Sequence, residues 1–561
     1  MQVARASLMR LQALRGYKGF LLAVILGALG VLGHAPFHIW PAFAVSICGL
    51  FLLLDGASPA LAGPVLQRAG TGKTKVGHPS ITGFRVAWSW AFGYFLGGMF
   101  WVGNAFLVDA EKFAALMPFA VTALPALLAL VWGIGGAIAL TFWRPHASRL
   151  LLFVFVFSSV EFARGHILTG LPWNLPAYIW RAGNVFSQTS ALIGPYGLSG
   201  LTLFVLACPV VLVTAKTKLE RYVIAGTSMA ILVAVSAFGL ARLHQAGPLD
   251  AMKGSGPIIA AGQAGFSQKE VWDPANTNRV TQTYLESLAS PEAQKADIVV
   301  WPEGAFPFLL LEQPDVLQAI EAKLGGRTLV LGSIRRNITP AGDIYSNSIL
   351  ALEITNGGLT LRAAYDKFHL VPFGEYLPFR PVFKALGIAS LVSYEGEMTP
   401  GSGPGLLEVK NAPLADPRVC YEIVFPGFNK MAQGKAGWIL NVSVDAWYGD
   451  LLGPDQHYAQ ARMRAIETGR PLVRAASGGW SSVTDRYGRA LAEHRSGAGF
   501  AVARLPLDAV TTIYDQFGEL VFSVFLLVML VFLVIWRQTK GDFIVELDTE
   551  PRQQKDIPYV K

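Results

Sequence analysis

The stretch VAWSWAFGYFLGGMFWVGNAFLV (86–108) carries no charged side chain, and it decides the class of fold. A helix needs about 20 consecutive apolar residues to cross the hydrocarbon core of a bilayer. Over the whole chain of 561 residues, 52% are hydrophobic and only 15% are charged. This composition is too apolar for an ordinary soluble protein, so we predict a membrane protein.

Apolar runs of the same character recur on both sides of this stretch. Two of them, 40–54 and 151–163, are short for a membrane span. Taken together, the runs predict about eight transmembrane helices. The remaining runs are 17–33, 113–143, 196–215, 222–241 and 520–536.

Basic residues in the short loops predict how these helices are oriented, because Lys and Arg concentrate on the cytoplasmic side. With the N-terminus inside, the outside loop 109–112 holds Asp109, Glu111 and a single Lys112. The inside segments are rich in Lys and Arg, which also accounts for the pI near 9.2 without a nucleic-acid partner. The inside basic residues include Arg5, Arg10, Arg15, Lys18, Arg68, Lys73, Lys75, Arg144, Arg149, Lys216, Lys218 and Arg221.

This orientation divides the chain into four segments. Residues 1–242 are predicted to form a seven-helix bundle, 516–540 a C-terminal membrane helix and 541–561 a cytoplasmic tail. Residues 243–515 fall on the far side of the membrane, which is the periplasm in a Gram-negative cell. In this insert, β-rich apolar runs alternate with helix-like stretches, which indicates an α/β domain.

Cys420, in RVCYE (418–422), has a different setting from the other two cysteines. Cys48 and Cys208 lie in apolar runs, where small buried hydrophobic side chains are the simplest interpretation. No CxxC pair or His/Cys cluster accompanies Cys420, so we predict neither a metal nor another cofactor. A structural thiol and a nucleophile both remain open from the local sequence.

A thiol nucleophile needs a base and a positive group that can stabilise an oxyanion. Glu303 follows the apolar run in ADIVVWPEG (296–304), and Lys367 follows LTLRAAYD (359–366). Strand ends are where α/β folds display catalytic groups. Taken singly, each residue is more simply a turn acid or a surface lysine, and His369 and His457 offer a Cys–His dyad instead.

In combination, WPEG (301–304), YDKFHLVPFGEYLPF (365–379) and RVCYE resemble the Glu-Lys-Cys motifs of the nitrilase (carbon-nitrogen hydrolase) superfamily. With the membrane helices, nearly the whole chain resembles the apolipoprotein N-acyltransferase family. The chain departs from the family at Ser477 and Gly478, where an Asn-Gly pair is usual, which leaves the role of that loop open. Other matching stretches are QAGFSQKEVWDP (263–274), YSNS (345–348), NVSVDAWYGD (441–450), GPDQHYAQARMRAIETGRP (453–471) and TGLPWNLP (169–176).

The resemblance implies an α-β-β-α sandwich and an acyl transfer at the bacterial inner membrane. The expected acyl donor is a phospholipid, phosphatidylethanolamine in particular, and the acceptor is the α-amine of a diacylglyceryl-cysteine on a lipoprotein. Glu303 would act as general base, Lys367 would stabilise the oxyanion, and Cys420 would carry the acyl group as a thioester. The Lys367 ammonium should also lower the pKa of the thiol.

The resemblance also suggests supporting residues around these three. Glu375 and Glu422 would help to hold the lysine and shape the site, although ordinary turn acids remain an alternative. Tyr421 would pack beside the nucleophile, and Trp272 would line the acyl entrance.

Two extramembrane stretches, AFPFLLL (305–311) and YLPFRPVFKALGIASLV (376–392), are unusually apolar. Exposed apolar patches mark partners or membranes, so we expect both loops to dip into the outer leaflet and gate the site. If the loops gate the site, changing Phe383 and Leu386 to serine should reduce lipid turnover without unfolding the domain. The alternative is that both loops belong to the core.

Two other functions remain possible. A membrane-tethered amidase or nitrilase would use the same three residues on water. A transporter or receptor would place functional charges in the bundle, and Glu161 and Arg164 near one span end are the candidates. These two residues could equally anchor the domain to the bundle.

Overall fold

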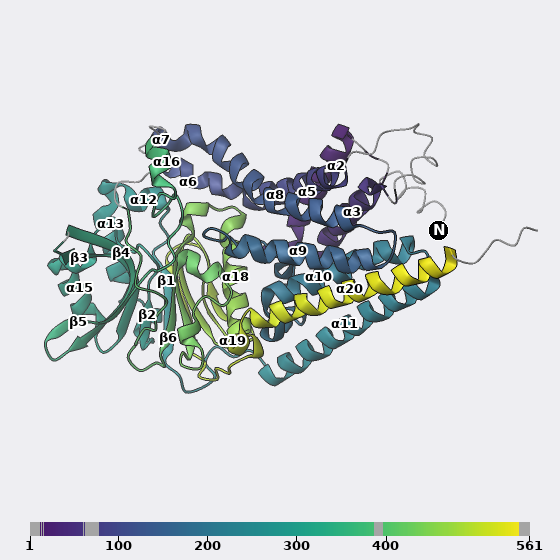
Figure 1. Ribbon diagram of the computed structural model, residues 1–561. Coiled ribbons are helices and arrows are strands. Elements are labelled where there is room, and N and C mark those ends of the chain that lie inside the picture. The colour runs from purple at the N-terminus through teal and green to yellow at the C-terminus, as the bar shows by residue number, and fades with distance from the viewer. Residues whose placement is uncertain are drawn as a thin grey trace, which may run out of the picture.

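The computed structural model consists of a helical bundle joined to an α/β domain at one end (Figure 1). It describes residues 12, 14, 16–59, 61, 78–340, 342–385 and 397–548. The predicted basic loop around Arg68, most of the predicted tail, and Leu386 with the rest of the second apolar loop lie outside the described residues.

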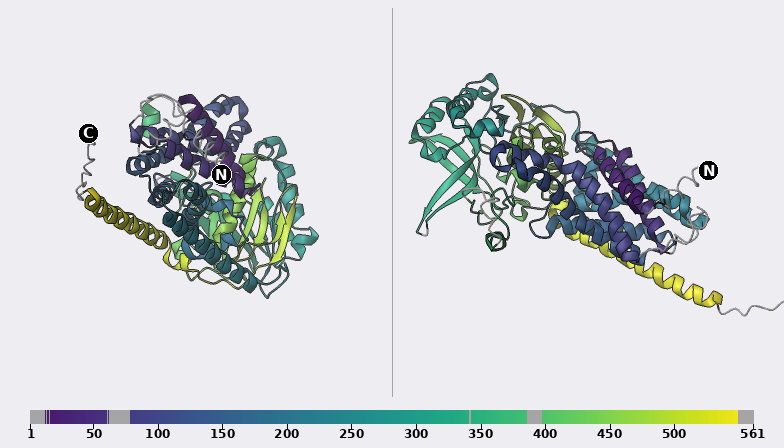
Figure 2. Two further views of the ribbon diagram at one scale, coloured as in Figure 1. Left: turned by 90° about the vertical axis from the view of Figure 1, so that its right-hand side faces the viewer. Right: turned by 90° about the horizontal axis from the view of Figure 1, so that it is seen from above.

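Eight long helices make up the described part of the bundle, and Figure 2 shows them running alongside one another. Six of them are long and apolar enough to cross a membrane. In α20 the described apolar part is Leu520–Ile535. The predicted membrane bundle is confirmed. The helices are α2 (Gly16–Gly30), α3 (Trp40–Ala57), α5 (Pro79–Met99), α8 (Met117–Phe142), α9 (Ser148–His166), α10 (Ser190–Thr214), α11 (Lys218–Ala246) and α20 (Leu520–Asp548).

Charged side chains inside the bundle are paired, as an apolar environment requires. Arg149 donates from Nε to Asp55 Oδ1 over 2.8 Å, and both side chains are buried. Glu161 and Arg164 form a second buried pair within α9. Arg164 also donates to the carbonyl of Leu171, in the loop between α9 and α10. The Gly170 carbonyl of the same loop accepts a hydrogen bond from Tyr421 of the α/β domain, which favours the anchoring role for the pair over a transport role.

Two sheets form the centre of the α/β domain, with strand orders β11-β1-β2-β3-β4-β5 and β10-β9-β8-β7-β6. Three neighbouring strands run parallel in each sheet, and the flanking strands run antiparallel. The first sheet contains β1 (Ile258–Gln263), β2 (Ile298–Val300), β3 (Thr328–Thr339), β4 (Gly342–Thr355), β5 (Gly358–Asp366) and β11 (Gly499–Arg504). The second contains β6 (Ala415–Val419), β7 (Trp438–Val444), β8 (Leu472–Ser477), β9 (Ser481–Thr484) and β10 (Ala490–His494).

The alternation of side chains along each strand builds the layers. In β2, Ile298 and Val300 face the second sheet, whereas Val299 faces outward. Helices α13 (Thr277–Ser287) and α15 (Pro314–Leu324) cover that outer face. Helix α18 (Leu452–Thr468) and the bundle cover the second sheet. This is the α-β-β-α sandwich that the resemblance implied.

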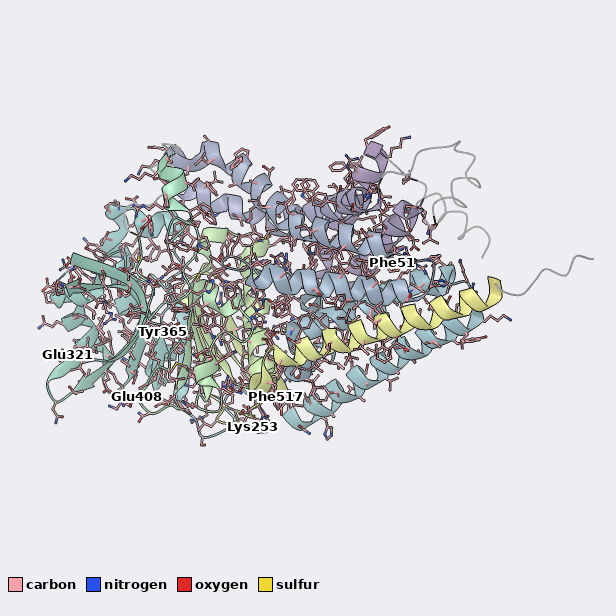
Figure 3. The ribbon with its side chains drawn as sticks, viewed as in Figure 1. Phe51, Lys253, Glu321, Tyr365, Glu408 and Phe517 are labelled. Atoms are coloured by element: carbon pink, nitrogen blue, oxygen red, sulfur yellow. The ribbon has the colours of Figure 1, made fainter. Side chains whose placement is uncertain are left out.

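The two parts of the molecule share a buried polar seam. Gln456 of α18 accepts hydrogen bonds from the indole N–H groups of Trp101 and Trp173, at 3.1 and 2.8 Å. Both tryptophans come from the bundle side of the chain. In Figure 3, Phe51 marks the interior of the bundle and Tyr365 the interior of the α/β domain. The seam therefore holds the domain in a fixed position against the membrane helices.

Candidate active site

The structure brings Glu303, Lys367 and Cys420 together. Each follows the carboxyl end of a strand, β2, β5 and β6 respectively. Lys367 Nζ lies 3.9 Å from Glu303 Oε1, and all three side chains are buried. Strand ends can display side chains in this way because the backbone there is free of the ladder and can turn. The predicted convergence is thus present in the fold.

Asn347 links the two carboxylates that surround the lysine. Its Nδ2 donates to Glu303 Oε1 over 2.6 Å and to Glu375 Oε1 over 2.9 Å. Glu375 in turn accepts from Lys367 Nζ at 2.9 Å and from the backbone N–H of Val371 at 2.8 Å. Glu375 therefore holds the lysine, as the resemblance implied.

The electrostatics of this group favour an ammonium beside a basic carboxylate. Burial favours the neutral amine of Lys367, but the carboxylates of Glu375 and Glu303 outweigh it and raise its pKa. Burial also raises the pKa of Glu303, and Lys367 offsets only part of this effect. A carboxyl whose pKa is raised toward neutrality is better suited to act as a general base.

Cys420 occupies a sharp turn between β6 and a short 3₁₀ helix (Cys420–Val424), with φ at +48°. A positive φ is uncommon for a residue with a side chain and is often found at functional sites. Burial and the charge of Glu303 raise the pKa of the thiol to about 12, although Lys367 acts in the opposite direction. Lys367 thus acts on the thiol pKa in the expected direction, but burial and Glu303 outweigh it.

Glu422 joins the cysteine turn to the lysine segment. Its Oε1 accepts from the backbone N–H groups of Phe368 and His369, and its Oε2 accepts from that of Val419 at 2.8 Å. Tyr365 donates a further hydrogen bond to Oε1 over 3.0 Å. Glu422 thus shapes the site as expected, and it is no ordinary turn acid.

Tyr421 connects the nucleophile turn to the bundle. Its hydroxyl donates to the carbonyl of Gly170 over 2.6 Å, and its ring packs edge-on against Phe425. His369 Nε2 lies 2.9 Å from the neighbouring carbonyl of Thr169. The loop after α9 therefore supports both flanks of the site.

A second polar group lies behind Cys420. The Ser443 hydroxyl is 3.4 Å from Cys420 Sγ and 2.7 Å from Asp445 Oδ1. His457 Nδ1 lies 2.8 Å from the same Asp445 oxygen, and Arg474 donates to the other over 2.6 Å. Because His457 is engaged by Asp445 and His369 by the bundle loop, the geometry does not favour a Cys–His dyad.

Trp272 and the first apolar loop, which were both predicted to lie at the entrance of the site, differ in their exposure. Trp272, at the end of α12 (Gln268–Trp272), is 43% exposed and packs edge-on against Trp447, 5.4 Å between ring centroids. In the first apolar loop, Phe306 and Leu310 are buried in the core beneath α13 and α15. The prediction that this loop dips into the membrane is wrong, because its side chains complete that core.

The described part of the second apolar loop is mixed, with Leu377 buried and several other apolar side chains exposed. Phe379 and Val382, the latter in α16 (Arg380–Ala385), are 62% and 56% exposed, and the nearby Phe373 is 54% exposed. Leu386 lies outside the described residues, and the structure does not describe the side chain of Phe383.

The loop that departs from the family pattern packs tightly against the polar group behind Cys420. Gly478 has φ at +67°, and a Cβ at this position would lie 2.6 Å from the backbone Cα of Ala446, so the turn requires glycine. Its N–H donates to Gln263 Oε1 over 2.8 Å. A Cβ on Gly479 would lie 2.2 Å from Asp445 Oδ2. Ser477 therefore stands in place of the usual asparagine, and Gly478 keeps the glycine that this turn needs.

Four residues of the site escaped the sequence argument as individuals: Asn347, Ser443, Asp445 and Arg474. The signal was present, since the stretches YSNS and NVSVDAWYGD contain three of them. Within the described ranges, no group of three or more His, Cys, Asp or Glu side chains could hold a metal ion.

The chain combines a membrane bundle with an α/β domain that holds a buried Glu-Lys-Cys group at its strand ends. This combination defines a membrane-bound protein of the carbon-nitrogen hydrolase class. Residues 258–514 match the family model described as carbon-nitrogen hydrolase. Residues 26–208 match the model of the apolipoprotein N-acyltransferase N-terminal domain.

Whole-length relatives agree with both matches. Apolipoprotein N-acyltransferase of Rhodopseudomonas palustris is 34% identical over 94% of this chain and 96% of its own length. That of Caulobacter vibrioides is 36% identical over 92% and 94%. A structure of the amidase from Nesterenkonia sp. AN1 covers 47% of this chain and 97% of its own, at 19% identity and a TM-score of 0.32. The chain belongs to the apolipoprotein N-acyltransferase family.

Proposed function

We propose that this chain transfers a fatty acyl group from a phospholipid, with phosphatidylethanolamine as the donor, to the α-amine of a lipoprotein's N-terminal diacylglyceryl-cysteine. The observation that carries this proposal is the convergence of Glu303, Lys367 and Cys420 beside the membrane bundle. Family membership supports the lipoprotein acceptor. The bundle would lie in the inner membrane, and residues 243–515 would face the periplasm.

In the first half-reaction, Glu303 takes the proton of Cys420 as the sulfur attacks the ester carbonyl of the phospholipid. Lys367, with a backbone N–H beside Cys420, stabilises the oxyanion of the tetrahedral intermediate. The carbon–oxygen bond breaks, the lysophospholipid leaves with the proton from Glu303, and an acyl thioester remains. Burial raises the pKa of the Cys420 thiol, so the sulfur needs Glu303 to take its proton during the attack.

In the second half-reaction, the α-amine of the diacylglyceryl-cysteine attacks the thioester carbonyl. Glu303 takes the amine proton, the carbon–sulfur bond breaks, and the proton returns to the Cys420 sulfur. The product is an N-acylated lipoprotein. Splitting one difficult acyl transfer into two easier steps is the advantage of a covalent intermediate.

The exposed apolar residues beside the site support access from the membrane. Phe373 and Phe379 flank the turn that holds Glu375, so lipids could reach the buried cysteine across their side chains. Replacing Phe373 and Phe379 by serine should slow turnover of a phospholipid in vesicles. Ile338→Ser gives the control, because Ile338 is an exposed apolar residue near the tip of the β3–β4 hairpin, at 80% exposure. Equal rates for all variants would refute this route.

Intact-protein mass spectrometry tests the proposed chemistry. The purified protein is incubated with phosphatidylethanolamine, with Cys420→Ala alongside. We expect a mass gain of one acyl chain that hydroxylamine removes and that Cys420→Ala lacks. Adding a diacylated lipopeptide should then discharge the adduct onto the peptide amine. Release of free fatty acid with an unmodified lipopeptide would instead indicate the hydrolase alternative.

A further inference from the structure

Ser443 stands between the reactive sulfur and a buried carboxylate. It lies in β7, whose Val442 pairs with Val419 of the neighbouring strand β6, directly before Cys420. The single Ser443 hydroxyl is within hydrogen-bond distance of both Cys420 Sγ and Asp445 Oδ1. A hydroxyl carries one proton, so only one of these two atoms can receive it at a time.

The geometry assigns that proton to Asp445. The contact with the carboxylate is 2.7 Å, against 3.4 Å to the sulfur, and a hydrogen bond to an ionised oxygen is the stronger kind. Asp445 is ionised, because Arg474 and His457 outweigh its burial and hold its pKa well below its usual range. The Ser443 oxygen therefore presents a lone pair to the Cys420 sulfur.

We propose that Asp445 and Ser443 keep the Cys420 sulfur protonated between turnovers by turning the Ser443 hydroxyl proton away from it. The inference rests on the proposed role of Cys420 as the acyl-accepting nucleophile. With the proton turned away, the thiol can donate its S–H to the Ser443 oxygen, whereas a thiolate would face a lone pair. Ser443 and Asp445 act through the sulfur, so they are positioning residues.

Keeping Cys420 as the thiol protects it from oxidation between turnovers. The thiolate, rather than the thiol, reacts with oxidants and electrophiles. A domain outside the cytoplasm meets an oxidising environment, and free thiolate there would be lost between turnovers. Proton removal is then left to Glu303, at the moment when a carbonyl carbon is in reach of the sulfur.

Some groups around the sulfur raise the pKa of Cys420 and others lower it. Burial raises it most, and Glu303 and Asp445 raise it further, whereas Lys367 lowers it. A Ser443 hydroxyl that donated to the sulfur would also lower it. Whether removal of the Ser443 hydroxyl lowers or raises the pKa of Cys420 therefore shows which way its proton points. Further titratable groups around the site are Tyr448, His457, Glu375 and Arg474.

The test is the alkylation rate of Cys420 in the folded protein, with no lipid present. Wild type and Ser443→Ala are treated with iodoacetamide at pH 8 in detergent, and peptide mass spectrometry follows the label on Cys420. We expect about 3- to 10-fold faster labelling in Ser443→Ala, the size of one hydrogen bond. Ser482→Ala, which removes a buried hydroxyl from β9 of the same sheet, should label at the wild-type rate.

An unchanged or slower rate in Ser443→Ala would overturn the proposal, because the hydroxyl would then be donating to the sulfur or doing nothing. Ser443→Ala removes one oxygen and leaves the Asp445 ion pairs intact, so the fold is retained. Asp445→Asn gives a second reading and should also label faster, since the Ser443 proton becomes free to face the sulfur.

Failure of this inference is distinguishable from failure of the proposed function. If wild type forms no acyl adduct with phospholipid but the variants label faster, the acyltransferase role fails and the protonation role stands. If wild type forms the adduct and Ser443→Ala labels no faster, the protonation role fails alone.

Discussion

Asn347→Leu should move the acid limb of the pH–rate profile to higher pH. Asn347 Nδ2 donates a hydrogen bond of 2.6 Å to Glu303 Oε1. Burial raises the pKa of the Glu303 carboxyl, and this hydrogen bond lowers it. Leucine has nearly the shape of asparagine but no donor. Without the bond, the carboxylate form of Glu303 is less stable, so a higher pH is needed to ionise the base.

The size of the effect follows from the bond that is lost. A hydrogen bond to a charged group contributes about 1.5–3 kcal/mol. Since about 1.4 kcal/mol corresponds to one pKa unit, the acid limb should move up by about 1–2 pH units. Glu303 keeps its bond from the Val444 N–H at 3.0 Å, which places the expected shift at the lower end.

The assay is the initial rate of acyl-enzyme formation from phosphatidylethanolamine between pH 5 and pH 9, followed by intact-protein mass spectrometry. Asn429→Leu is the matched control. Asn429 is also buried, and its Nδ2 donates a hydrogen bond of 2.8 Å to the carboxylate of Asp416. We expect the control to keep the wild-type profile. A profile of Asn347→Leu that drops in height without moving, or that moves to lower pH, would refute the reasoning.

Three further predictions concern the neighbouring residues. Glu303→Gln should abolish the acyl adduct yet speed iodoacetamide labelling of Cys420 at pH 8, because the charge of Glu303 raises the thiol pKa; slower labelling would contradict this. Tyr421→Phe should lose its bond to the loop after α9 and lower the free energy of unfolding by about 1 kcal/mol, measured by denaturant titration in detergent. Glu422→Gln should cost about 1–3 kcal/mol in the same titration, since an amide N–H would face the Val419 N–H; equal stability would show that the turn can rearrange.

Local patterns determined much of this protein in advance. The runs that became α5, α8, α10 and α11 are too long and apolar for any setting but a membrane, so length and composition sufficed. Glu303 and Lys367 each come shortly after a strand-like run, but it was the combination of WPEG, YDKFHLVPFGEYLPF and RVCYE that singled them out.

The apolar loop at 305–311 is a case in which local composition does not determine the environment of the segment. Its composition suits a membrane surface and a protein core equally, because both are apolar environments. Only the placement of α13 and α15 over the first sheet decided for the core, where Leu310 is fully buried.

The chemical state of the site was decided by tertiary structure alone. The sequence by itself determined that Glu303 and Lys367 each follow a strand-like run in the same segment that holds Cys420. It could not determine that the thiol pKa rises to about 12, since this depends on how much water the surrounding layers exclude from Cys420 and on its distance from Glu303. Nor could it place Asn347 between two carboxylates or Ser443 between sulfur and Asp445, because these contacts join segments far apart in the chain. Burial and long-range contact depend on the packing of the whole fold, and no short stretch of sequence contains them.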